Sequence, residues 1–211
     1  MTPSLYAVLT AARAQLASAG IASPDADAVE LASFVLGVPT SEVRRRMVLR
    51  DPIDDVATSR LADLIAERSA RIPLQHLTGR AYFRGLTLAV GPGVFVPRPE
   101  TEVVTGLALE AAREAVAAGI REPVVVDLCT GSGAIALAVK DELPAARILA
   151  VEKSEHAYAW AQRNRELLGP QANAGLRTLF INAALNLAIA LVPGSRIDLW
   201  GHVGGALTGA L

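Results

Sequence analysis

The chain is poor in cysteine and nearly neutral, and each of these shortages excludes a class of protein. Its single cysteine, Cys129, excludes an internal disulfide and a multi-cysteine zinc site, and it fits a reducing compartment. The net charge is −1, from 20 Lys and Arg against 21 Asp and Glu, so charge gives no reason to expect a protein that wraps a polyanion. The first thirty residues contain acidic groups and lack a continuous apolar run, which predicts no secretory signal.

Apolar residues are plentiful, at 52% of the chain against 19% charged, so we expect a packed core rather than disorder. The arginine run at 44–46 is better explained as a solvated helix face than as a nucleic-acid patch. We therefore predict no direct nucleic-acid partner and no metal site.

Residues 1–74 have the apolar spacing of helices and predict a small helical bundle without a catalytic residue of its own. Gly20 ends the first helical pattern, and Ser23-Pro24 has the form of a cap with proline at the first helical position. The segment 37–39 stops that second helix, a cap at Thr40 or Ser41 begins a third, and a fourth runs from about residue 56 to 68.

Residues 75–100 change to the pattern of a β-hairpin followed by an extended linker. Apolar residues between 82 and 90 alternate with turn glycines at 79, 85, 91 and 93. Pro97 and Pro99 then favour an extended chain before a helix at 101–118.

From residue 123 the pattern is that of an α/β fold with a parallel sheet. Val124–Leu128 is a continuous apolar strand, which predicts burial on both faces. A turn at 130–133, a helix at 134–140, a strand at 148–152 and a helix at 154–168 complete one βαβ unit and the next crossover.

The glycine turn at 130–133 is the candidate ligand-binding site. It opens a helix directly, so main-chain N–H groups and the positive helix end face a ligand, and Gly131 and Gly133 can take positive φ. Asp127 can accept hydrogen bonds from turn amides or an ammonium group, and Glu152 stands where an acid can bind ribose hydroxyls. The alternatives are a turn without a ligand and a dinucleotide site. The full G-x-G-x-x-G pattern is absent, and the acid precedes the glycines, which favours an adenosyl ligand with an amino-acid tail.

Three segments, YFRGL (82–86), PGVFVPRPETE (92–102) and DLCTGSGAIAL (127–137), resemble the bacterial release factor glutamine methyltransferases. The resemblance covers about residues 5–169. It implies a helical substrate-recognition domain at 1–74, a β-hairpin linker at 75–100 and a partial class I (Rossmann-like) methyltransferase domain at 101–169. It also implies a cytoplasmic enzyme of translation termination, which uses S-adenosyl-L-methionine to methylate the glutamine side-chain amide of the GGQ motif in peptide chain release factors.

The resemblance further implies which residues bind the cofactor. Cys129 stands where the family usually has glycine, and Glu152 replaces a commoner aspartate. The family's Asn-Pro-Pro-Tyr loop, which would orient the target amide, has no counterpart because the chain contains no Asn-Pro pair; no catalytic residue is therefore assigned. The implied cofactor residues are Asp127, Cys129, Thr130, Gly131, Ser132, Gly133 and Glu152.

The end of the chain has a different character. Residues 178–195 carry no charge and are close to membrane-spanning length, although a helix packed on the sheet is an alternative. Residues 171–211 resemble the end of rhomboid intramembrane proteases. The resemblance would make His202 the catalytic histidine of that family, but the motif Gly-x-Ser-Gly, which holds the partner serine, is absent. We thus predict a truncated sheet with an apolar helical tail at 170–211 and a junction near 169–177. The alternatives to an active enzyme are an inactive chimeric or truncated product, a release-factor-binding module, and a membrane-associated fragment anchored through 178–211.

Overall fold

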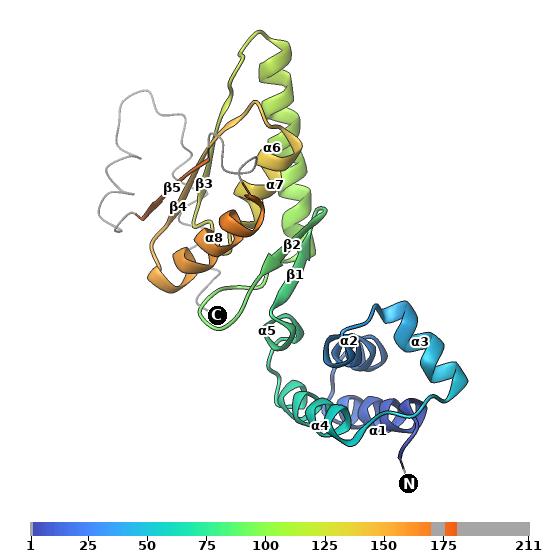
Figure 1. Cartoon of the computed structure of the whole chain (residues 1–211). Helices are drawn as coiled ribbons and strands as arrows, with labels where there is room; N and C mark the ends of the chain where they lie inside the picture. The colour runs from blue at the N-terminus through green and yellow to red at the C-terminus, as the bar shows by residue number, and fades with distance from the viewer. Residues whose placement is uncertain (1, 170–175, 181–211) are drawn as a thin grey trace. The chain divides into compact units, whose positions relative to one another are not determined.

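The computed structural model describes residues 2–169 and 176–180, which fall into two compact units. The first unit contains the residues up to Tyr82 together with Thr87–Val96. The second contains Phe83–Leu86 and the described residues from Pro97 onward. Figure 1 labels the elements of both units, which are taken here one at a time.

The first unit is a helical bundle, as predicted. Its helices are α1 (Leu5–Ser18), α2 (Pro24–Leu36), α3 (Thr40–Leu49), α4 (Asp55–Ser69) and the short α5 (Leu74–Thr78). The apolar residues recur at helical spacing, so each of the four long helices turns one face inward. The buried core contains, among others, Leu5, Leu9, Leu16, Leu31, Val43, Leu61 and Ile65.

The helix ends agree with the sequence signals except at α3. Gly20 follows α1 with a φ of 69°, and Pro24 occupies the first turn of α2. The N-cap of α3 is Pro39 and not Thr40 or Ser41. The carbonyl of Pro39 accepts hydrogen bonds from the amides of Glu42 and Val43, so the helix is already closed one residue earlier than a hydroxyl cap would place it. Helix α5 was not predicted.

The predicted hairpin is present as β1 (Arg80–Phe83) and β2 (Leu86–Ala89). Arg84 and Gly85 connect the strands, with φ values of 49° and 94°. Two consecutive positive φ values are those of the tight turn whose twist matches paired strands, and glycine suits its second position.

The second unit is built on a parallel three-stranded sheet, ordered β3 (Val124–Leu128), β4 (Arg147–Glu152), β5 (Leu176–Phe180). Val124 lies opposite Arg147, and Ile148 opposite Leu176. Helix α7 (Ala134–Glu142) connects β3 to β4, and α8 (Glu155–Leu167) follows β4 (Figure 1). Helix α6 (Pro99–Ala117) precedes β3 and packs against α7. The predicted βαβ unit is confirmed, but the sheet has a third strand that was not expected.

The prediction that β3 is buried on both faces is wrong. Val124 and Val126 are 63% and 47% exposed, whereas Asp127, which points to the other face, is buried. Parallel crossovers are almost always right-handed. Because β3, β4 and β5 lie in chain order, both crossovers run the same way across the sheet and place α7 and α8 on one face. An apolar strand sequence cannot indicate on which side the next crossover runs.

The third strand also corrects the prediction for the tail. Residues 178–180 belong to β5, so the expected apolar helix does not begin at 178, and strand structure continues beyond the junction predicted near 169–177. The remainder of that segment, with the tail from 181 to 211 and His202, lies outside the described residues. Across residues 2–169 and 176–180, no helix combines the length and the apolar character needed to cross a membrane.

Candidate functional site

The glycine turn follows β3 and leads into α7 within five residues. Gly131 and Gly133 have φ values of 59° and 84°, and Gly133 is the N-cap of α7. The amide of Gly133 donates to the carbonyl of Thr130 at 2.9 Å, which closes the turn. The positive φ values expected for both glycines are therefore present.

The two glycines differ in what surrounds them. A Cβ at Gly133 would come within 3.1 Å of Leu137 and 3.6 Å of Ala161. That space is occupied by the protein's own side chains, so the glycine at 133 permits close packing of α7 and α8 rather than the approach of a ligand. Gly131 is only partly buried, whereas Ser132 and Gly133 are buried. Access from solvent to the turn is therefore concentrated at Gly131 and the preceding Cys129, which is exposed.

Asp127 stabilises the turn through hydrogen bonds to its side chain. Its side chain is 6% exposed, and its Oδ2 accepts hydrogen bonds from the Thr130 hydroxyl at 2.6 Å and the Ala136 amide at 3.1 Å. Burial raises the pKa of Asp127, the two hydrogen bonds oppose that shift, and the nearby charge of Glu152 adds to it. The sequence predicted that Asp127 would accept from amides of the turn or from an ammonium group; in the described residues it accepts instead from the Thr130 hydroxyl and from the amide of Ala136, which lies in the first turn of α7.

Glu152 joins the end of β4 to the turn. It is 7% exposed, and its Oε2 accepts a hydrogen bond from the Gly131 amide at 2.8 Å. Its Oε1 accepts from the amides of Lys153 at 2.8 Å and Ser154 at 2.9 Å. A carboxylate offers about four acceptor positions, so one is left for a further donor.

Cys129 takes a left-handed conformation, with φ at 62°. For a residue with a Cβ this conformation costs about 1–2 kcal/mol. Although the residue is exposed, partial desolvation of its thiol raises the pKa of Cys129, and the negative charges of Glu152 and Asp127 raise it further. The thiol form is therefore favoured, which argues against a nucleophilic role for Cys129.

Two further hydrogen bonds hold the turn, one between backbone groups and one from a side chain. The Thr130 amide donates to the Val151 carbonyl at 2.9 Å, and the buried Asn164 side chain on α8 donates to the Ser132 carbonyl at 2.9 Å. Asn164 was not predicted, because a single asparagine within an amphipathic helix carries no signal of its partner. The structure thus brings all seven predicted residues together around one turn.

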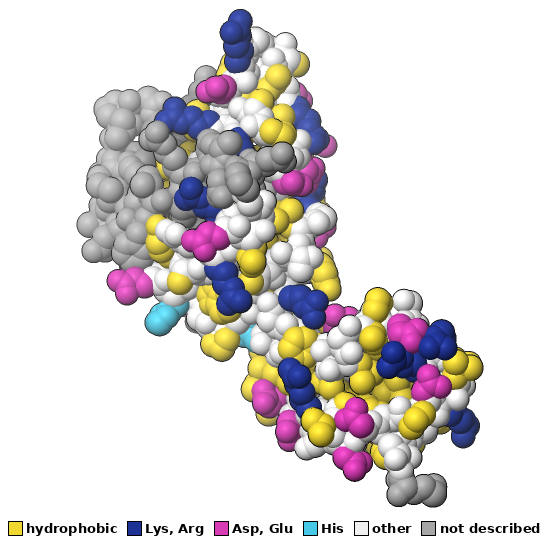
Figure 2. All heavy atoms as spheres, viewed as in Figure 1, with side chains coloured by type: hydrophobic (Ala, Val, Ile, Leu, Met, Phe, Trp, Pro, Cys, Tyr) yellow, Lys and Arg dark blue, Asp and Glu magenta, His cyan; other side chains and the backbone are white. Residues whose placement is uncertain are grey.

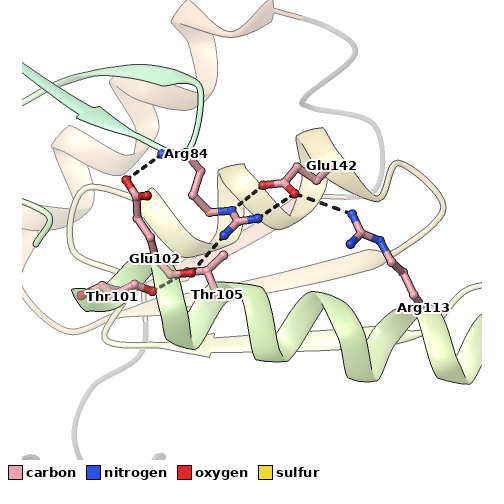
Figure 3. A network of polar contacts seen from close by, with 6 residues as sticks. All are labelled: Arg84, Thr101, Glu102, Thr105, Arg113 and Glu142. Carbon is pink, nitrogen blue, oxygen red and sulfur yellow. Dashed lines mark hydrogen bonds and ion pairs between the residues drawn. The ribbon is translucent and has the colours of Figure 1, made fainter. Parts of the chain in front are cut away.

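A polar network outside the turn was also missed (Figure 3). The Arg84 guanidinium donates to both carboxylate oxygens of Glu142 and to the Glu102 carbonyl, and the Arg84 amide donates to the Glu102 carboxylate. Arg113 lies 3.6 Å from Glu142 on its other side. The network fastens the hairpin turn to the N-terminal part of α6 and the C-terminal end of α7. Arg84 and Glu102 stand in motifs noted above, but nothing in the sequence links either to Glu142.

The described residues contain no group of three or more His, Cys, Asp or Glu side chains that could hold a metal ion. What the turn offers chemically is two buried carboxylates beside a partly exposed glycine at the start of a helix. Such a set suits a ligand with hydroxyl or ammonium donors.

Comparison with known proteins finds relatives that are named release factor glutamine methyltransferases. Residues 7–79 match the family model "PrmC N-terminal domain". The chain is 52% identical over 162 residues to the release factor glutamine methyltransferase of Streptomyces coelicolor, which covers 77% of this chain and 54% of that protein. Proteins of the same name from Mycolicibacterium smegmatis and Bifidobacterium longum are 46% and 41% identical over 160 residues, which is 76% and 74% of this chain and 53% of each relative.

The chain therefore spans about half the length of the curated relatives it matches. These matches agree with the resemblance drawn from the sequence motifs. They do not support a rhomboid origin for residues 171–211, and they give no support to membrane association through that segment.

Proposed function

We propose that the chain holds S-adenosyl-L-methionine at the turn of residues 127–133 with Glu152, as part of a release factor glutamine methyltransferase. The observation that carries the proposal is that two buried carboxylates both bond to the glycine turn, Glu152 to the Gly131 amide and Asp127 to the Thr130 hydroxyl, in a chain that is 52% identical over 162 residues to a protein of that name. The cofactor would supply the methyl group, and the acceptor would be the GGQ glutamine amide of a peptide chain release factor.

The donors and acceptors of the turn fit that cofactor. Glu152 retains one acceptor position for a ribose hydroxyl. Asp127 has used only Oδ2 among the described residues, so Oδ1 is available to an ammonium group. Cys129 and Gly131 would lie against the ligand, while Thr130, Ser132 and Gly133 would hold the backbone in the shape that the ligand meets.

Methyl transfer needs more than this half-site. An amide nitrogen is a poor nucleophile, and an enzyme must bind the amide so that its lone pair faces the methyl group. The family positions that amide with an Asn-Pro-Pro-Tyr loop, and no Asn-Pro pair occurs in the 211 residues. We therefore expect weak cofactor binding and no methyl transfer by this chain alone.

Two measurements test the proposal. Isothermal titration with S-adenosyl-L-methionine should show binding that Asp127→Ala abolishes; binding that survives this substitution would move the cofactor elsewhere. Incubation with labelled cofactor and a purified release factor should leave the glutamine unmethylated, and label on the GGQ glutamine would show that the chain has an acceptor site we have not identified.

A second candidate function is favoured by one observation. The helical unit, which has its own buried core, matches a family model over residues 7–79. Under this proposal the chain, with a helical domain at 1–74, a linker at 75–100 and a partial methyltransferase domain at 101–169, acts as a release-factor-binding module. Immobilised chain that does not retain a purified release factor would remove this candidate.

A further inference from the structure

One face of the parallel sheet is left exposed along β3. Helices α7 and α8 pack against the face that contains Ile148 and Ala150, and both of these residues are buried. Val124 and Val126 of β3 lie on the opposite face, and both are exposed. An apolar sheet face becomes part of a stable core only when another layer covers it.

The exposed face continues from β3 onto β4. Val126 lies opposite Leu149 in the parallel ladder, so the two side chains share this face. Leu149 is half-buried, and the next residue of β4 on the same face, Val151, is buried. The only charged side chain that β3 and β4 place on this face is Arg147, at the beginning of β4. The exposed patch is therefore apolar and is centred on β3.

Exposed apolar side chains also occur on α6, but their surroundings differ. Val103 and Leu107 are exposed on this helix, which also carries exposed acids such as Glu100 and Glu110. Figure 2 shows hydrophobic and charged side chains interspersed over α6. Single apolar residues among charged ones are common on protein surfaces and need no covering layer. Helix α6 therefore supplies control positions rather than a docking surface.

The segment that follows β5 has the composition to cover the exposed face. Residues 181–195, which lie outside the described residues, carry no charge, and ten of these fifteen residues are Ala, Val, Ile or Leu. Strand β5 ends at Phe180 and forms the edge of the sheet opposite β3. Two strand spacings amount to about 10 Å, whereas a segment of this length spans about 22 Å even as a helix. It is therefore long enough to reach the exposed valines.

The hand of the crossovers directs a returning chain to the same face. The connections from β3 to β4 and from β4 to β5 run in one direction across the sheet, with α7 and α8 on one side. Because parallel crossovers are almost always right-handed, a chain that turns back from β5 toward β3 passes over the opposite side. That side is the one on which Val124 and Val126 are exposed.

We propose that residues 181–195 pack on the exposed face of β3. The patch is apolar and the segment is uncharged, so neither has to bury a charge when they meet. Both belong to one chain, which gives the segment a much higher effective concentration at the patch than a second copy of the protein has. The proposal does not depend on the proposed function, because it concerns only the sheet and the segment that follows it.

Chemical labelling of a cysteine on the face tests the proposal in the full chain. In a Cys129→Gly background, which removes the one natural thiol, Val126→Cys places a single thiol on the exposed face. Val103→Cys in the same background is the matched control, because it replaces an exposed valine on α6. The rate of reaction with a maleimide is measured for each, with and without the paired substitutions Leu187→Glu and Leu191→Glu in the segment.

We expect the two glutamates to speed labelling at position 126 about tenfold, because an uncovered thiol reacts without waiting for the segment to open. Labelling at position 103 should not change. Equal rates at position 126 with and without the glutamates would overturn the proposal. Protection at position 126 that strengthens as the protein concentration rises would also overturn it, because a second copy would then cover the face.

A crosslink tests the same contact without adding charge to the segment. In the Cys129→Gly background, Val126→Cys combined with Leu187→Cys should form an internally linked monomer with a short bismaleimide. Val103→Cys combined with Leu187→Cys is the control and should form this product much more slowly. Linkage only between two chains, or equal internal linkage in both variants, would contradict packing of the segment on β3.

Discussion

Replacing Arg84 with asparagine should loosen the hairpin turn from the rest of the second unit without disturbing the turn itself. Arg84 has a φ of 49°, a conformation that asparagine adopts more readily than arginine does. The backbone amide that donates to Glu102 is retained in the variant. What is lost is the guanidinium, with its two hydrogen bonds to Glu142 and its bond to the Glu102 carbonyl.

The size of the effect follows from the exposure of the pair. The Arg84 and Glu142 side chains are 24% and 28% exposed, so solvent replaces part of each lost contact. A hydrogen bond to a charged group contributes about 1.5–3 kcal/mol, and a partly exposed bidentate pair should fall near the lower end, at about 2 kcal/mol. Relief of turn strain returns up to about 1 kcal/mol. We therefore expect Arg84→Asn to lower the free energy of unfolding of the second unit by about 1–2 kcal/mol.

Urea unfolding, followed by Trp160 fluorescence in a Trp200→Phe background, measures the change. A double-mutant cycle with Glu142→Gln separates the pair from other effects of the substitution and should give a coupling of about 1–2 kcal/mol. Arg113→Ala is the control, because Arg113 is 52% exposed and 3.6 Å from Glu142, and it should cost at most about 0.5 kcal/mol. A coupling of no more than about 0.5 kcal/mol, the largest cost expected for the control, would refute the claim that Arg84 fastens the hairpin turn to α7.

Three further outcomes are expected. The hydrogen bond from Arg84 lowers the pKa of Glu142 below its ordinary value of 4.5. The stabilisation by ionised Glu142 is therefore fully present above pH 4.5 and is lost as the pH falls through the lowered pKa. The difference in unfolding free energy between the original chain and Glu142→Gln should shrink in acid. Cys129→Gly should raise the free energy of unfolding by about 1 kcal/mol, because glycine accepts a φ of 62° without strain, and a loss of stability would contradict this. Asp127→Asn should be as stable as the original chain at neutral pH or more so, since burial raises the pKa of Asp127 and its ionised form opposes folding there, while titration shows weaker binding of S-adenosyl-L-methionine.

The sequence predicted what depends on local pattern. The strand Val124–Leu128 has the bounds expected from its apolar run, and the glycine turn, the following helix and Glu152 lie where their spacing placed them. These features are set by residues within about thirty positions of each other, so period and turn residues are sufficient.

The features that the sequence did not predict depend on contacts between residues far apart in the chain or on the arrangement of neighbouring elements. Glu142 is 58 positions from Arg84, and Asn164 is 32 from Ser132, and neither pair follows from any repeating pattern. The strand Leu176–Phe180 overlaps in the sequence with the uncharged run that begins at 178, and the length of that run favours a helix over a strand. The exposed face of β3 depends on the direction of the crossovers, which strand composition does not encode.

Glu152 and Asp127 show how stability and ligand choice are linked at the turn. Glu152 accepts three backbone amides, one of them from Gly131, so the turn keeps its shape without a ligand. Holding Asp127 beside it, buried and within reach of its charge, raises the pKa of Asp127 and opposes folding at neutral pH. A ligand that brings positive charge to this pair relieves the repulsion, whereas a pyrophosphate adds to it. The arrangement that stabilises the turn is therefore also the physical reason to expect a cationic amino-acid tail here rather than a dinucleotide.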